Sequence, residues 1–176
     1  MNSFIVKGNI VWSESSKDLK SVENGFLVIK DGIVEGVFSS LPDEYKNYEL
    51  VDTGNDLVVP GLVDLHVHAP QFAFRGTNMD LELMDWLNTY TFPEESKFSD
   101  LSYADNVYSF FTDAIKKSAT TRIVAFSSLH VDGTLLLMDK LDKIGIRGYV
   151  GKVNMDRNSP DTLREESAEK AAEDTE

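Results

Sequence analysis

The sequence predicts a protein of the α/β class that begins with a β-rich segment. Residues 1–60 contain short runs of β-branched and aromatic side chains separated by turn residues. Pro60 and Gly61 then interrupt the pattern. From residue 62 onward, short apolar runs alternate with segments whose apolar residues repeat at helical spacing. This alternation is typical of parallel strands joined by helices, in a sheet or a barrel.

In the first part of the chain the pattern predicts five short strands, over residues 4–12, 26–30, 33–38, 50–52 and 57–59. Asp31-Gly32 lies between the second and third of these runs and is a strong signal for a tight hairpin turn. We therefore expect residues 1–60 to form a β-rich segment and residues 61–176 to form a separate α/β unit.

In the second part the pattern predicts strands over 62–68, 122–126 and 146–153, and helices over 79–90, 101–115 and 135–144. Ser99 or Asp100 is expected to cap the second helix, Asp132 to cap the third, and Gly145 to end it. The composition of residues 161–176 favours a solvated helix or a frayed end, and the sequence shows no signal that would end such a helix. Because three strands cannot close a barrel, we expect the chain to be the N-terminal part of a longer protein.

Charge and composition exclude several classes of partner. The net charge of −13 argues against binding to nucleic acid or to an anionic membrane surface. The chain has no cysteine, so any metal must be held by His and carboxylate side chains. The first residues resemble no signal peptide, and no apolar run could span a bilayer, so we expect a cytoplasmic protein.

The most informative segment is PGLVDLHVH, residues 60–68. In a strand, successive side chains alternate between the two faces, so His66 and His68 share one face with Asp64. Leu65 and Val67 should face the covering helices. Two neighbouring imidazoles can form one edge of a site for zinc, iron, copper or nickel. Alternatively, the two rings merely pack or form hydrogen bonds inside the fold.

The same segment resembles the first barrel strand of the amidohydrolase superfamily. The residues that follow are similar to the guanine deaminase branch of that superfamily: Ala69-Pro70-Gln71-Phe72, Arg75-Gly76, Asp80-Leu81, Trp86-Leu87, Tyr90-Thr91-Phe92-Pro93 and the run from Gly148 to Asp156. The resemblance implies the N-terminal part of a (β/α)8 TIM barrel preceded by a small β-sandwich segment. Ser118-Ala119-Thr120-Thr121 departs mildly from a Gly-Thr-Thr-Thr run that is frequent in this family.

The resemblance also implies a function and a set of site residues. His66 and His68 match two ligands of a zinc ion, with iron as an alternative metal, and the metal activates water for attack on guanine to give xanthine and ammonia. His68, Ala69, Pro70 and Gln71 match the substrate-binding segment. The later His, Asp and proton-shuttling Glu side chains of the family have no match in this chain, so we assign no catalytic residue.

The residues themselves leave several roles open. Without the resemblance, Gln71 would be an ordinary polar loop residue. Asp64 either orients a metal-bound histidine as an outer partner or forms a hydrogen bond at the barrel mouth. His130 follows a strand and could lie near the catalytic face, but a lone histidine is rarely a ligand. A surface role is expected for Arg75.

Three functional readings remain. The first is a guanine deaminase, expected to be a homodimer in its full-length form and to use a small-molecule substrate. The second is another purine or triazine aminohydrolase of the same superfamily. The third is an inactive, truncated fragment. On any of them we expect the 176 residues alone not to deaminate guanine.

Overall fold

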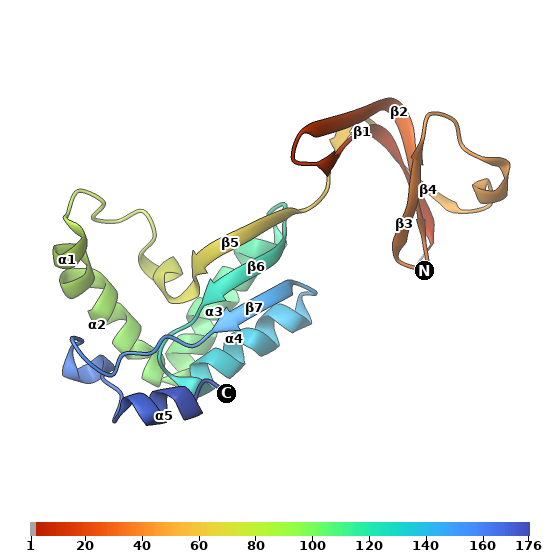
Figure 1. The fold of residues 1–176 in the computed structure, drawn as a ribbon. Coiled ribbons are helices and arrows are strands. Elements are labelled where there is room, and N and C mark those ends of the chain that lie inside the picture. Colours follow the sequence, from red (N-terminus) through yellow and green to blue (C-terminus); the bar gives the residue numbers. More distant parts are fainter. Residues whose placement is uncertain (1–2) are drawn as a thin grey trace. The chain divides into compact units, whose positions relative to one another are not determined.

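A computed structural model describes residues 3–176 (Figure 1). The chain divides into two compact units, Met1–Pro60 and Gly61–Glu176. In the described part of the chain, no helix has the length and apolar character needed to cross a membrane.

The first unit is one four-stranded sheet with the strand order β3-β2-β1-β4. Its strands are β1 (Phe4–Ser15), β2 (Asp18–Lys30), β3 (Ile33–Phe38) and β4 (Glu49–Val58). The pairs β1–β2 and β2–β3 are antiparallel, whereas β1 and β4 are parallel. A sandwich would require a second sheet, which residues 3–58 do not form.

Local backbone geometry explains two features of this sheet. Asp31 and Gly32 both have positive φ, 52° and 81°, which is the conformation of a type I′ hairpin turn. The predicted short strands at 50–52 and 57–59 are instead one continuous strand, β4. An irregularity in the β1–β4 pairing and the left-handed conformation of Gly54 (φ 63°) let β4 continue through its polar middle section.

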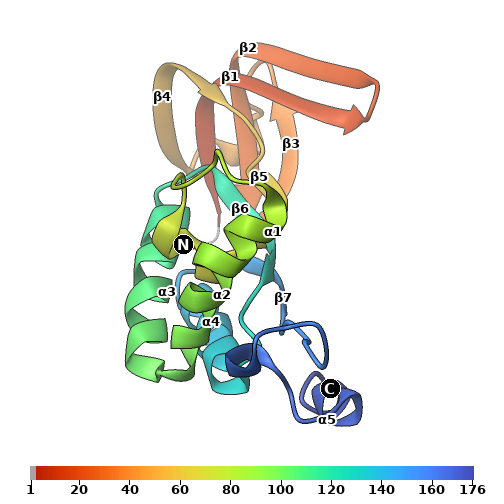
Figure 2. The same cartoon turned by 90° about the vertical axis from the view of Figure 1, so that its left-hand side faces the viewer.

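The second unit is built on a parallel three-stranded sheet with the order β5-β6-β7. Its strands are β5 (Leu62–His68), β6 (Thr120–Phe126) and β7 (Arg147–Gly151). Helix α3 (Leu101–Lys116) connects β5 to β6, and α4 (Val131–Lys143) connects β6 to β7. Figures 1 and 2 show both helices on the same side of the sheet. The prediction of alternating strands and helices with parallel pairing is confirmed.

The core of this unit lies between the sheet and these two helices. Tyr108 and Phe111 of α3 and Leu137 of α4 are at most 1% exposed and pack against Ile123 of β6. The spacing of Ala104, Tyr108 and Phe111, which predicted the helix over 101–115, therefore corresponds to its buried face, whereas Leu101 at its start is exposed.

The helix ends show which polar residues act as caps. Asp100, rather than Ser99, caps α3, because its carboxylate accepts a hydrogen bond from the backbone N–H of Ser102 at 2.8 Å. The predicted cap at Asp132 is wrong: His130 occupies the N-cap position, and Asp132 lies in the first turn of α4, where the helix dipole favours a carboxylate. Gly145, with φ 77°, ends α4 as predicted.

The helix predicted over 79–90 begins later and extends further. It starts as α1 (Leu83–Trp86), widens into a π-helical turn (Leu87–Thr91), continues as α2 (Phe92–Glu95) and ends in a 3₁₀ turn (Ser96–Ser99). Pro93 explains the irregularity, because proline has no N–H to bond the carbonyl group four residues earlier. The last segment, predicted as a helix or a frayed end, contains a short 3₁₀ turn (Asp161–Leu163) and α5 (Ala168–Glu173).

Candidate metal and substrate site

His66 and His68 lie side by side at the carboxyl end of β5. The centroids of the two imidazole rings are 5.0 Å apart, and the ring of Phe126 on β6 lies 5.3 Å from the first and 4.8 Å from the second. The predicted common face of the two histidines is therefore confirmed. Phe126 forms an apolar wall that restricts the orientation of both rings.

The surroundings of His68 favour its neutral form. Burial lowers the pKa of His68, and the neighbouring charge of His66 lowers it further. A neutral imidazole has a free lone pair, which is the form that binds a metal. The pair therefore suits two positions of a zinc or iron coordination sphere. No group of three or more potential ligands is gathered within residues 3–176, so the pair is an incomplete donor set by itself.

Asp64 and Leu65 are placed differently from the simplest strand pattern. A carboxylate oxygen of Asp64 accepts the backbone N–H of His66 at 3.1 Å, so Asp64 contacts the main chain of this residue. Leu65 was expected to face the helices but is 72% exposed. The β5–β6 pairing shifts register between Asp64 and Val67, and β5 is the outer strand of this sheet, so only Val67 packs against the core.

The segment after β5 forms a 3₁₀ turn, η2 (Ala69–Phe74), that separates buried from accessible side chains. Ala69 and Pro70 are fully buried, so they could reach a ligand only through their backbone atoms. Gln71 is half-buried, and its side-chain nitrogen Nε2 lies 3.5 Å from a carboxylate oxygen, Oε1, of Glu95. The turn thus holds a polar amide three residues after His68.

A cavity of about 660 Å³ lies beside these residues. Its volume is in the range of small-molecule binding sites. It is lined by both histidines and Gln71, together with aromatic and aliphatic side chains that include Phe72, Phe74 and Trp86. Arg75 also lines the cavity, with its guanidinium group 3.7 Å from the ring centre of Phe72 and a hydrogen bond to the Phe72 carbonyl oxygen at 2.8 Å. Arg75 is exposed, as expected for a surface residue, and its guanidinium group packs over the cavity-wall residue Phe72.

Glu95 was not recognised from the sequence. Its side chain is only 5% exposed, and burial raises the pKa of its carboxyl group to about 7. A signal was available: Leu87, Thr91 and Glu95 follow each other at intervals of four residues, which places a carboxylate on the inner face of the helical segment.

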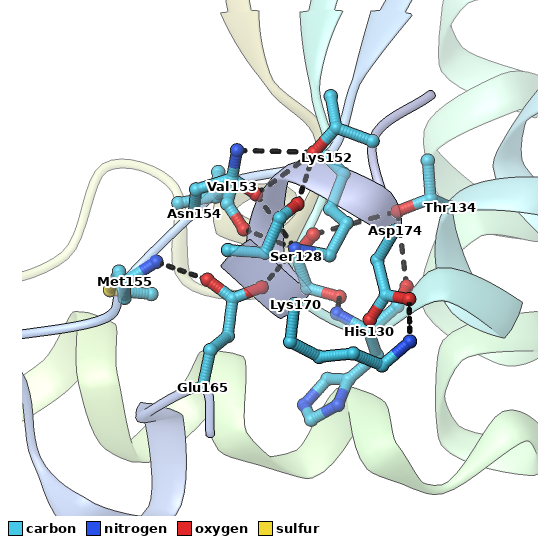
Figure 3. A network of polar contacts seen from close by, with 12 residues as sticks. Ser128, His130, Thr134, Lys152, Val153, Asn154, Met155, Glu165, Lys170 and Asp174 are labelled. Atoms are coloured by element: carbon cyan, nitrogen blue, oxygen red, sulfur yellow. Dashed lines mark hydrogen bonds and ion pairs between the residues drawn. The ribbon is translucent and has the colours of Figure 1, made fainter. Parts of the chain in front are cut away.

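The carboxyl ends of β6 and β7 carry a separate polar network (Figure 3). Lys152 forms an ion pair with Glu165, and its ammonium group also donates to the side-chain oxygen of Asn154 at 2.7 Å. Burial lowers the pKa of His130, and the charge of Lys152 lowers it further. The nitrogen Nε2 of His130 is buried and has no hydrogen-bond partner among the described residues. The backbone of His130 joins this network, because its N–H donates to Oγ of Ser128 at 3.3 Å and its carbonyl oxygen accepts from the hydroxyl group of Thr134 at 3.0 Å. Within residues 3–176 His130 belongs to no group of three or more potential metal ligands.

The model of the amidohydrolase family matches residues 57–176. The chain belongs to the amidohydrolase family. The match covers β5 with its histidine pair, the cavity beside it and the whole parallel sheet, so the site described above lies within the family domain.

Known amidohydrolases similar to this chain include guanine deaminases. The enzyme of Dictyostelium discoideum is 35% identical over 175 residues, which are 89% of this chain and 39% of that protein. The enzyme of Rattus norvegicus is 43% identical over 122 residues, which are 69% of this chain and 27% of that protein. The crystal structure of guanine deaminase from C. acetobutylicum with bound guanine is 42% identical, with a TM-score of 0.93 over 98% of this chain and 41% of that one. The chain thus spans about two fifths or less of the length of these relatives.

Proposed function

We propose that the natural protein carrying this sequence catalyses the metal-dependent hydrolytic deamination of guanine to xanthine and ammonia. The observation that carries the proposal is that His66, His68 and Gln71 line one cavity of small-molecule size. The similarity to guanine deaminases, one of them solved with bound guanine, supports guanine as the substrate.

His66 and His68 would hold the metal, with zinc as the expected ion and iron as the alternative. When bound, the ion supplies the Lewis acidity that activates water for attack on C2 of the purine. The close packing of both rings against Phe126 keeps the imidazoles together, so little side-chain freedom is lost on binding. Asp64 supports this arrangement through its hydrogen bond to the backbone of His66. The proposed site also needs further ligands and a proton-shuttling glutamate, which residues 3–176 do not group with this pair.

The segment from His68 to Gln71 would bind the substrate. The amide of Gln71 can donate and accept hydrogen bonds, which suits the edge of a purine. Aromatic side chains in the cavity wall, such as Phe72 and Trp86, provide flat apolar surface for the face of the base. The backbone of Ala69 and Pro70 adds contacts that do not depend on their buried side chains.

The architecture proposed for the natural protein is a (β/α)8 barrel with a small β domain. Residues 61–176 would be the first strands and helices of the barrel, and residues 1–60 would be part of the β domain. The order β5–α3–β6–α4–β7, in which parallel strands alternate with helices as in such a barrel, supports this proposal. In such barrels the carboxyl ends of the strands form the active site, which is where His68 lies.

The experiment is to load the natural protein with zinc and to follow guanine loss and xanthine formation by absorbance, with ammonia measured separately. Adenine and a chlorinated triazine serve as competing substrates. We expect turnover with guanine and little or none with the other two. Efficient turnover of the triazine or of adenine with no reaction of guanine would replace this proposal by the second reading, another aminohydrolase of the same family.

A further inference from the structure

We propose that Glu95 is a positioning residue that holds the side-chain amide of Gln71 in one orientation and so sets which hydrogen-bonding groups face the substrate. The consequence for substrate recognition rests on the proposed function, whereas the contact between the two side chains does not.

The fold brings these two residues together across 24 positions of sequence. Glu95 is the last residue of α2, and Gln71 lies in η2, which packs against α2 and α3. The carboxylate of Glu95 is directed inward with 5% exposure, and the distance from its oxygen Oε1 to Nε2 of Gln71 is 3.5 Å. Gln71 in turn lines the cavity that contains His66 and His68. Glu95 itself does not line this cavity, whereas its partner Gln71 does.

Glu95 lacks the partner that a buried carboxylate normally has. None of the ion pairs among residues 3–176 includes Glu95, whereas the adjacent Glu94 pairs with Lys97 at 2.5 Å. Four residues before Glu95, the hydroxyl oxygen of Thr91 is also buried without a hydrogen-bond partner among the described residues. Burying a carboxyl group without a cation costs free energy. A role through Gln71, its one side-chain hydrogen-bond partner among residues 3–176, accounts for the presence of Glu95 in this position.

The chemistry of the amide explains what Glu95 would control. A glutamine side chain has two N–H donors on one side and one carbonyl acceptor on the other. In the structure the NH₂ group of Gln71 faces Oε1 of Glu95, and a carboxyl oxygen that carries no proton can only accept, so this contact requires the NH₂ group to turn toward Glu95. One N–H is then used by Glu95, and the carbonyl oxygen and the second N–H remain available for a base edge. Without Glu95 the amide can rotate by half a turn, which exchanges donor and acceptor at the substrate.

The neighbouring titratable group from α3 is Tyr108. Burial is the main cause that raises the pKa of Tyr108 to about 12, and the charge of Glu95 contributes to the rise. Tyr108 uses its hydroxyl group in a buried hydrogen bond of 2.9 Å with Ser127. The hydroxyl group of Tyr108 is therefore already bonded to Ser127, which follows β6, and this leaves Gln71 as the group that Glu95 orients.

A direct test labels the natural protein with ¹⁵N-glutamine and assigns the side-chain NH₂ signal pair of Gln71, the only glutamine among residues 1–176, by its loss in Gln71→Ala. We expect Glu95→Leu to move this pair toward the positions of a free amide and to reduce the separation of its two protons. The control Glu94→Ala removes an adjacent carboxylate and should leave the signals unchanged. Unchanged Gln71 signals in a folded Glu95→Leu variant would overturn the proposed contact.

A kinetic cycle in the zinc-loaded natural protein tests the consequence for the substrate. Glu95→Leu should raise KM for guanine roughly five- to tenfold with a smaller change in kcat, as expected for loss of one oriented hydrogen bond. Glu95→Gln keeps a polar partner of the same size but offers both a donor and an acceptor, so its KM should lie between those of wild type and Glu95→Leu. In a Gln71→Ala background, Glu95→Leu should have no further effect on KM. Additive effects of the two substitutions would show that Glu95 acts independently of Gln71 and would overturn the inference.

The two arms separate this inference from the proposed function. If the zinc-loaded wild-type protein does not deaminate guanine, the proposed function is wrong, and the NMR comparison still decides whether Glu95 orients Gln71. If guanine is deaminated and the Gln71 signals are unchanged in Glu95→Leu, only the inference about Glu95 is wrong. Should Glu95→Leu fail to fold, the cycle with Glu95→Gln and Gln71→Ala decides the question, since independence in that cycle also contradicts the inference.

Discussion

The ammonium group of Lys152 and the carboxylate of Glu165 form an ion pair in which the two side chains are only 4% and 6% exposed. The other carboxylate oxygen of Glu165 accepts the backbone N–H of Met155 at 2.6 Å. Lys152 follows β7 directly, so the pair attaches the segment around residue 165 to the carboxyl end of the sheet (Figure 3).

Removing one partner of this pair should destabilise the protein strongly. Lys152→Met leaves Glu165 as a buried charge without a cation, which typically costs about 3–5 kcal/mol. The double variant Lys152→Met/Glu165→Leu should recover much of that loss because no charge remains buried. Urea unfolding measures both, with Asp161→Asn as the control, since Asp161 is 93% exposed in its pair with Arg164. A Lys152→Met variant as stable as this control would contradict the structural role of the pair.

Gly148 should tolerate no side chain, whereas Gly151 in the same strand should tolerate one. A Cβ atom added at Gly148 would lie 1.9 Å from the carbonyl oxygen of Ile123 on β6, and this backbone oxygen cannot move without breaking the β6–β7 pairing. At Gly151 no atom lies within 4 Å of an added Cβ. We expect Gly148→Ala to lower the free energy of unfolding by at least 2 kcal/mol and Gly151→Ala to have little effect. Equal stabilities would argue against the parallel pairing described for β7.

The buried carboxyl group of Glu95 should make stability fall as the pH rises. Burial raises the pKa of Glu95 from 4.5 to about 7 in the folded protein. Between these values the folded state retains a proton that the unfolded state has released, so the stabilisation present below pH 4.5 is lost as the pH passes 7, by up to roughly 3 kcal/mol. His68 and His130 have lowered pKa values and act in the opposite direction.

The measurement is therefore a comparison of variants. Unfolding free energies from pH 4.5 to 8 should fall less steeply with pH in Glu95→Gln than in wild type, because this variant has no proton to release at the site. Glu94→Gln, which changes an adjacent glutamate that pairs with Lys97, should keep the wild-type slope. Identical slopes in wild type and Glu95→Gln would mean that Glu95 does not titrate near neutral pH.

Gln71→Ala should weaken guanine recognition without affecting metal binding. Loss of a hydrogen-bond partner for a bound polar edge costs about 1–3 kcal/mol, so kcat/KM for guanine should fall by a factor of roughly 5 to 150. Zinc content should remain that of wild type because Gln71 contacts neither imidazole in the hydrogen bonds of the described residues. An unchanged kcat/KM would remove Gln71 from the substrate site.

Features that depend on local sequence could be predicted. The alternation of side chains along a strand placed His66 and His68 on one face, and the separation of 5.0 Å between the two ring centroids agrees. The turn at Asp31-Gly32 and the end of α4 at Gly145 were predictable because both need positive φ, a property of single residues.

Features that depend on packing between distant segments could not be predicted in the same way. Whether Glu95 is buried depends on how the irregular helix around Pro93 packs against η2. The two partners in this contact, Gln71 in η2 and Glu95, are 24 residues apart in the sequence. The exposure of Leu65 follows from its place in an outer strand and from the shifted β5–β6 register. Sequence periodicity predicts neither the burial of Glu95 nor the exposure of Leu65, because it describes one element without its neighbours.

The central claim is that His66 and His68 together hold the metal of a deaminase site. The most direct measurement is the zinc content of the purified natural protein and of its His66→Ala and His68→Ala variants, with His130→Ala as the matched control, because His130 lies in the separate network at the ends of β6 and β7. We predict stoichiometric zinc in wild type and in His130→Ala, and loss of most of the zinc in each of the other two variants. Full zinc occupancy in both His66→Ala and His68→Ala would contradict the assignment.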